Sequence, residues 1–251
     1  MKNLEKIGCG TALVTPFLKG GEIDFSTLKR LVSFQIEGGI NFLVPCGTTG
    51  ENATLSAEEH LKVVETVVTT ADGKVPVIAG AGGYNTSTVI KMAKAVEKCG
   101  ADGILSVTPY YNKPTQEGLF QHYRALAGEV GLPIILYNVP GRTGTNLLPE
   151  TVIRLSEIDN IVAIKEASGN VDQISELSVK VPKGFMILSG DDANTLPMIA
   201  MGASGVISVV ANQVPGMMVA LAQACLRGKF DKARSLQAQL YDLMKEKVIG
   251  W

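Results

Sequence analysis

The feature that most constrains this chain is a repeated alternation of short apolar runs with longer amphipathic stretches. The short runs are rich in β-branched residues, and two of them, GVISVV and IVAIK, have hardly a polar position. Continuous apolar strands are typical of parallel sheets that are covered on both faces. We therefore predict eight parallel strands, at Gly10–Pro16, Asn41–Pro45, Pro76–Ala79, Gly103–Val107, Pro133–Asn138, Ile161–Lys165, Phe185–Leu188 and Gly205–Val209.

The stretches between these runs have the period of amphipathic helices. One of them begins with a capping box, because Glu59 follows Ser56 at the third position along the chain. The predicted helices include Ser26–Glu37, Ala57–Thr70, Ser87–Lys98, Gln116–Gly128, Pro149–Ser156 and Lys229–Lys245. Strands and helices that alternate in this way indicate βα units around a parallel sheet.

Eight βα units in 251 residues match the size of a (β/α)8 TIM barrel. The alternative is a doubly wound sheet, whose dinucleotide fingerprint GxGxxG follows the first strand. Gly8 and Gly10 instead lie at the start of that strand, and Leu13 stands where the third glycine belongs. With no linker and no short repeat, we predict one barrel domain over residues 1–228 and a C-terminal helical segment over residues 229–251.

Charge and hydropathy exclude several partners. The chain has 23 basic and 24 acidic residues and a formal net charge of -1, which does not suit a protein that binds nucleic acid. No apolar run reaches the roughly 18 residues that span a bilayer, and the start MKNLEKIGCGTALVTPF lacks the apolar core of a signal peptide. We expect a cytoplasmic protein without a membrane partner.

The cysteines predict neither disulfides nor a metal site. They are scattered without a CxxC motif, and the chain has only two histidines. We expect reduced cysteines that mostly pack in the interior, at Cys9, Cys46, Cys99 and Cys225.

Polar residues gather where five of the predicted strands end. In a barrel the carboxyl ends of the strands meet on one face, which carries the active site. The segments concerned are Cys46–Glu51, Thr108–Tyr111, Tyr137–Gly144, Lys165–Gly169 and Ser189–Asp192. We therefore predict a site of hydroxyls, phenols, one arginine and one lysine on that face.

Lys165 ends the run IVAI, so its strand carries it into an apolar barrel mouth. Loss of hydration there disfavours the charged ammonium, and a neutral amine attacks carbonyl groups. The resulting Schiff base supplies the electron sink that a cofactor or metal would otherwise provide. The alternative is a snorkelling lysine or one paired with Glu166.

Other side chains on this face suit proton transfer and carboxylate binding. Tyr137 and Tyr111 carry phenols that can donate and accept protons, although they could equally be core aromatics. Thr48 and Thr49 lie in a glycine-flanked loop whose N–H groups could hold a carboxylate, and Arg142 offers a planar fork for another. Taken singly, these loops are also compatible with an ordinary turn and a solvated arginine.

Five motifs in this order, GTTGE, TPYYNKP, YNVPGRTG, IKEASGN and SGDD, resemble the dihydrodipicolinate synthase family of the pyruvate-dependent class I aldolases. The resemblance runs from about Gly8 to the end of the chain. It implies a (β/α)8 barrel and a lyase that condenses pyruvate with L-aspartate-4-semialdehyde in lysine and diaminopimelate biosynthesis. It implies no cofactor beyond the Schiff base on the enzyme.

The resemblance also assigns roles to single residues. Lys165 would form the Schiff base with pyruvate, and Tyr137 would be the acid/base. Thr48 and Tyr111 would complete a proton relay, with Tyr111 reaching into the active site of a neighbouring subunit of a homo-oligomer. The remaining assignments concern substrate binding, with the pyruvate carboxylate at Thr49, the semialdehyde carboxylate at Arg142, and backbone contacts from Gly190 and Ile207.

Two departures from the family pattern give further expectations. At the feedback site for lysine, His60 and Tyr110 match, but Ala57, Tyr84 and Thr88 do not, so we predict weak or absent inhibition by lysine. Family chains also continue beyond the point where this one stops. We therefore expect a shortened C-terminal extension, with the family's tetramer of dimers reduced to a dimer or monomer.

Two rival functions remain open at this stage. One is a related aldolase or lyase for sugar acids, similar to N-acetylneuraminate lyase, and the other is a non-catalytic relative that keeps the barrel. Arg142 favours a second substrate with a carboxylate near its aldehyde, whereas sugar-acid enzymes favour neutral polar groups that bind hydroxyls. The joint presence of Lys165, Tyr137, Thr48 and Arg142 argues against loss of chemistry.

Overall fold

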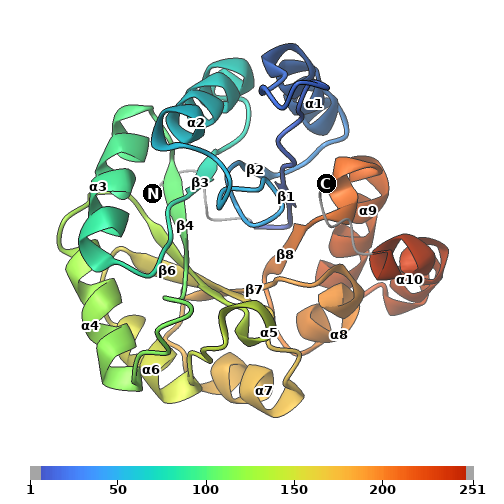
Figure 1. The fold of residues 1–251 in the computed structure, drawn as a ribbon. Helices are drawn as coiled ribbons and strands as arrows, with labels where there is room; N and C mark the ends of the chain where they lie inside the picture. Colours follow the sequence, from blue (N-terminus) through green and yellow to red (C-terminus); the bar gives the residue numbers. More distant parts are fainter. Residues whose placement is uncertain (1–6, 247–251) are drawn as a thin grey trace.

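Eight parallel strands form a ring at the centre of the molecule, with helices around it (Figure 1). The computed structural model describes residues 7–246. The strands are β1 (Cys9–Ala12), β2 (Phe42–Val44), β3 (Ile78–Gly80), β4 (Gly103–Val107), β5 (Ile134–Asn138), β6 (Ile161–Glu166), β7 (Met186–Ser189) and β8 (Gly205–Ser208). Their order in the sheet is β2-β1-β8-β7-β6-β5-β4-β3. A parallel bridge between Leu43 and Val77 joins the two ends, so the ring closes and the predicted (β/α)8 barrel is confirmed.

The helices cover the outside of the ring in chain order. They are α1 (Phe25–Glu37), α2 (Ala57–Ala71), α3 (Thr86–Lys98), α4 (Gln116–Ala127), α5 (Pro140–Thr143), α6 (Pro149–Leu155), α7 (Val171–Lys180), α8 (Thr195–Ala200), α9 (Pro215–Leu226) and α10 (Phe230–Lys245). The last of these, α10, packs against α9 on the side away from the barrel (Figure 1). None of the described helices is long and apolar enough to cross a membrane.

The predicted strands and helices agree with the observed ones to within a few residues, and β1 differs most. The predicted strand ran to Pro16, but β1 ends at Ala12. Beyond that point the hydrogen bonds go to loops rather than to neighbouring strands. Val14 N donates to Asn212 Oδ1 at 3.2 Å, and Thr15 Oγ1 donates to Gly50 O at 2.7 Å. These contacts fold the chain over the top of the barrel.

The capping box at the start of α2 is confirmed. Glu59 N donates to Ser56 Oγ at 3.2 Å, and Ser56 N donates to Glu59 Oε2 at 2.8 Å. The two bonds satisfy helix N-terminal donors that would otherwise have no partner.

The buried apolar residues form two shells. The larger lies between the strands and the outer helices, and the smaller fills the inside of the barrel, where Phe42, Ile135, Ala163 and Ile207 meet. Gly10 makes room for the Phe42 ring, since a Cβ on Gly10 would come within 2.2 Å of it. The inner shell plugs the barrel below the site.

All four cysteines are free thiols, and three of them are buried, as predicted. Within residues 7–246 no group of three or more histidine, cysteine or acidic side chains is arranged to hold a metal ion. The predicted C-terminal segment at 229–251 contains α10. The predictions that concern the first residues and the final segment Lys247–Trp251 lie outside the described residues.

Candidate active site

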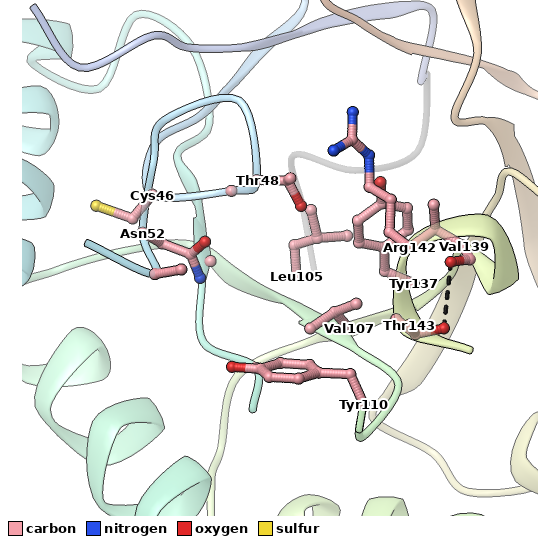
Figure 2. Close-up of a pocket in the computed structure, with 14 residues that line it drawn as sticks. Cys46, Thr48, Asn52, Leu105, Val107, Tyr110, Tyr137, Val139, Arg142 and Thr143 are labelled. Carbon is pink, nitrogen blue, oxygen red and sulfur yellow. Dashed lines mark hydrogen bonds between the residues drawn. The ribbon is translucent and has the colours of Figure 1, made fainter. Parts of the chain in front are cut away.

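A cavity of about 230 Å³ opens at the carboxyl ends of β2, β4 and β5 (Figure 2). Three of the predicted site residues, Thr48, Tyr137 and Arg142, line it. Figure 2 shows Thr48 on one side of this cavity and Tyr137 and Arg142 on the other. The structure thus brings together side chains that are 89 and 94 positions apart in the chain where the barrel rule expects a site.

Lys165 lies beside this cavity on β6 and is buried, with 5% of its surface exposed. It is the register partner of Tyr137 on β5. Its Nζ lies 4.2 Å from the centroid of the Tyr137 ring. The predicted nucleophile and the predicted acid/base are therefore in contact inside the barrel mouth.

Glu166 does not pair with Lys165. Successive residues on a strand point to opposite faces, so Glu166 faces outward while Lys165 faces the barrel interior. The Glu166 carboxylate accepts hydrogen bonds from Asn138 Nδ2 at 3.0 Å, Gln173 Nε2 at 3.1 Å and Ser168 N at 2.6 Å. Its acceptor positions are used on that outer face, and the ion-paired alternative for Lys165 is not what the structure shows.

Gly190, directly after β7, lies against Lys165. A Cβ at this position would lie 3.1 Å from both Cε and Cγ of Lys165 and 2.8 Å from Cβ of Ala167. The absence of a side chain thus leaves space for the extended lysine. Gly190 N also donates to Glu166 O at 2.9 Å, which extends the ladder to the end of β6.

The loop after β2 carries Thr48 and Thr49 in a constrained conformation. Cys46 and Glu51, at its two ends, both have positive φ values, of 54° and 56°. Such values are costly for residues other than glycine, by roughly 1–3 kcal/mol, and persist where the surrounding structure enforces them. Thr48 is exposed to the cavity and Thr49 is half-buried.

Cys46 lines the cavity, although sequence reasoning gave it only a packing role. Its Sγ donates to His60 O at 3.6 Å, and burial raises the pKa of the thiol to about 12. The thiol therefore stays protonated near neutral pH and is not a nucleophile there. Asn52 and Thr143 also line the cavity, and neither stood out in the sequence because each is a single polar residue in a polar loop.

Arg142 lies at the rim on α5, a single helical turn. Thr143 Oγ1 donates to Val139 O at 3.1 Å and to Thr145 O at 2.8 Å, and these bonds stabilise the turn. The Arg142 side chain is exposed, and its guanidinium lies above the Tyr137 ring in the view of Figure 2. A rim arginine is placed to meet an incoming carboxylate.

Five of the eight predicted site residues are not part of the cavity lining: Lys165, Thr49, Gly190, Tyr111 and Ile207. Tyr111 is 89% exposed, with a φ of 70°, and its ring is presented to solvent on the loop after β4. Ile207 is buried within β8, where its side chain belongs to the inner shell of the barrel.

A family model covers nearly the whole chain. The model described as the dihydrodipicolinate synthetase family matches residues 6–249. The chain belongs to this family. The five motifs of the sequence and the site built from their residues agree with that membership.

Relatives with assigned names are similar over most of their length. The chain is 55% identical over 233 residues to 4-hydroxy-tetrahydrodipicolinate synthase of Geotalea daltonii, covering 93% of this chain and 80% of the relative. It is 49% identical over 239 residues to the enzyme of that name from Desulfotalea psychrophila, covering 95% of this chain and 80% of the relative.

A solved structure shows the same fold. The crystal structure of dihydrodipicolinate synthase from Aquifex aeolicus superposes with a TM-score of 0.94 at 46% identity, covering 97% of this chain and 83% of that one.

Proposed function

We propose that this protein condenses pyruvate with L-aspartate-4-semialdehyde, the reaction of 4-hydroxy-tetrahydrodipicolinate synthases in lysine and diaminopimelate biosynthesis. Relatives with this name are about half identical to the chain, and the match covers about four fifths of their length. The observation that carries the proposal is the buried Lys165 amine, 4.2 Å from the centroid of the Tyr137 ring at the carboxyl face of the barrel.

Lys165 performs the first steps as the nucleophile. Its amine adds to the ketone carbon of pyruvate, the ketone oxygen leaves as water, and an iminium forms. The iminium then accepts the electron pair of a methyl C–H bond, which gives an enamine and releases one proton. The enamine carbon attacks the aldehyde carbon of the second substrate, and the amino group of that substrate later displaces Lys165 as the ring closes.

Each of these steps moves a proton, and we assign its transfer to Tyr137. Its ring contacts Lys165 and also lines the cavity, where Thr48 is its neighbour (Figure 2). A phenol with a hydroxyl neighbour can donate a proton to the departing water and accept one from the methyl group. The lysine iminium holds the electron pair, so this pathway needs no separate cofactor.

The two substrate carboxylates call for two binding groups. Thr49 and the N–H groups of the loop after β2 hold the carboxylate of pyruvate, with backbone contacts from Gly190 and Ile207 near the lysine. Arg142 at the rim holds the carboxylate of the semialdehyde through its planar fork. An exposed arginine at this place favours an aldehyde that carries a carboxylate. The aldehyde substrate of a sugar-acid enzyme instead needs neutral groups that bind its hydroxyls.

The exposed position of Tyr111 supports a homo-oligomer. Its side chain is 89% exposed and its backbone takes a strained conformation that projects the ring outward. We assign this phenol to the proton relay of a second copy of the chain, with Thr48 and Tyr137 of that copy.

Chemical trapping tests the proposal. The protein is incubated with pyruvate, reduced with borohydride and digested, and the adduct is located by mass spectrometry. We expect pyruvate on the peptide that contains Lys165 and none in Lys165→Ala. An unlabelled Lys165 peptide from the unaltered protein contradicts the mechanism, and turnover of a sugar-acid aldehyde in preference to the semialdehyde contradicts the substrate assignment.

A further inference from the structure

A buried polar cluster lies behind the site, on the outer face of the sheet. Its members are Glu166 on β6, Asn138 on β5, Gln173 on α7 and Asn146 in the loop after α5; we call it the outer clamp. Glu166, Asn138 and Gln173 are at most 5% exposed. None of the four lines the cavity, and Glu166 and Asn138 lie on the face of the sheet opposite Lys165 and Tyr137.

The Glu166 carboxylate is held by N–H groups rather than by a cation. Among residues 7–246, no basic side chain forms a salt bridge with it. Its three hydrogen bonds come from Asn138, Gln173 and the backbone of Ser168. Burying an acid is costly unless its oxygens are bonded in this way, so the carboxylate and its donors hold one another in place.

The clamp is in register with the reacting pair. Tyr137 is the partner of Lys165, and the next pair along the same two strands is Asn138 and Glu166. Because side chains alternate between faces, the first pair lies inside the barrel and the second lies directly behind it. The bond from Asn138 Nδ2 to Glu166 Oε2, at 3.0 Å, therefore joins β5 to β6 at the place where Lys165 and Tyr137 emerge.

Asn138 also holds the loop that carries Arg142. Its Oδ1 accepts from Leu147 N at 2.9 Å, and its Nδ2 donates to Asn146 Oδ1 at 2.8 Å. This loop starts at Asn138 itself, so one side chain fixes both of its ends. Gln173 strengthens the closure, since Asn146 Nδ2 donates to its Oε1 at 3.0 Å.

We propose that Glu166 is a positioning residue, which acts through Asn138 to set Lys165, Tyr137 and the Arg142 loop relative to one another. The inference rests on the proposed Schiff base at Lys165. Misplacement of reacting groups by about 1 Å can cost roughly a hundredfold in rate, so a change at Glu166 reaches the chemistry without contact with substrate.

The test compares Glu166→Gln with Asn160→Ala. Glutamine keeps the size of the side chain, but one of its two terminal atoms becomes a donor that faces N–H groups. Asn160 precedes the opposite end of β6, where its Nδ2 donates to Ala127 O and Val130 O, both at 3.0 Å. It is the matched control for loss of side-chain bonds next to the same strand.

Two readouts separate positioning from a general loss of stability. In Glu166→Gln we expect the initial rate of pyruvate trapping at Lys165 to fall at least about tenfold, and KM for the semialdehyde to rise at least about threefold. In Asn160→Ala both values should stay within about twofold of the unaltered protein, whatever the loss of Tm.

A second variant keeps the test decisive if the first is too unstable. If Glu166→Gln does not fold, Gln173→Met removes one donor to Glu166 and should slow trapping by about threefold.

Three outcomes would overturn the positioning role: trapping and KM within twofold of the unaltered protein in Glu166→Gln, the same for the foldable Gln173→Met, or equal losses in Asn160→Ala. These results differ from a failure of the proposed function. In that case the unaltered protein itself is not labelled at Lys165.

Discussion

Lys165 and Tyr137 face each other from neighbouring strands, with the lysine Nζ 4.2 Å from the centroid of the tyrosine ring. The face of an aromatic ring attracts a cation. The amine of Lys165 becomes a cationic iminium during the proposed reaction, so the ring stabilises the intermediate while the hydroxyl moves protons. These two contributions can be separated experimentally.

Tyr137→Phe keeps the ring and removes the hydroxyl. We expect turnover to fall at least about a hundredfold, because proton transfer by a positioned group contributes about that much. Tyr241→Phe is the control, since this phenol is exposed on α10, which packs against α9 outside the barrel. It should keep both its stability and its turnover. Turnover of both variants is measured by steady-state kinetics, and a near-normal rate for Tyr137→Phe contradicts the proposed proton relay.

Gly190→Ala tests whether the space next to Lys165 is needed. The added methyl group would lie 2.8 Å from Cβ of Ala167, which cannot rotate away, and 3.1 Å from Cγ and Cε of Lys165, so both the local backbone and the lysine side chain must shift. We expect turnover and pyruvate trapping to fall at least about tenfold. Gly128→Ala, where the nearest atom is Arg124 O at 3.5 Å, should leave both unchanged. Normal trapping in Gly190→Ala would show that Lys165 tolerates displacement.

Mixing two inactive variants tests the role of Tyr111 in a second copy. Tyr111→Phe lacks the phenol and Lys165→Ala lacks the nucleophile, but a mixed dimer contains one site with both. After denaturation and refolding of an equal mixture, about a quarter of the normal activity should return, since half of the dimers are mixed and each has one complete site. Activity no higher than the sum of the two variants means that Tyr111 does not serve a partner.

Sensitivity to lysine should be weak or absent. His60 is buried with its Nε2 2.9 Å from Gly80 O, and the Tyr84 and Tyr110 rings meet edge to face at 5.4 Å. The family resemblance implies an asparagine at the position of Tyr84 in members with feedback, and here that position carries an aromatic ring. Half-maximal inhibition at submillimolar lysine contradicts the prediction. The double variant Tyr84→Asn/Thr88→Glu should bind lysine more tightly than the parent, as measured by calorimetry.

Much of the site could be predicted because the barrel converts strand order into spatial proximity. Lys165 and Tyr137 each end an apolar run, and parallel strands place such ends on one face. The outer clamp could not be predicted in this way. Its bonds join Glu166 to Asn138 and Gln173, and a strand pattern shows which face a side chain takes but not which distant group it meets there. The exposed setting of Tyr111 likewise depends on a local φ of 70° that the pattern TPYYNKP does not reveal.

Stability should fall in mild acid because of His122. This side chain is buried between α3 and α4, where Thr86 Oγ1 lies 2.9 Å from its Nδ1, and its Nε2 has no hydrogen-bond partner in the described structure. Burial lowers the pKa of His122 to about 4 from its ordinary value of 6.5. The folded state therefore holds the ring neutral, whereas the unfolded chain takes up a proton as the pH falls below about 6.5.

This difference in proton binding decides the direction in which stability changes with pH. The unfolded state binds more protons between the two pKa values, so the contribution of His122 to stability is complete above about pH 6.5 and is lost as the pH falls toward 4. Between about pH 7.5 and pH 5 the loss should be about 2 kcal/mol.

His122→Asn cannot titrate but retains a partner for the Thr86 hydroxyl. Its free energy of unfolding, measured with urea, should be lower at neutral pH but should change less with pH by that amount. Asp192 and His60, whose pKa values are also shifted, are present in both proteins and cancel in the comparison. Parallel pH profiles for the two proteins would show that His122 is not the group responsible.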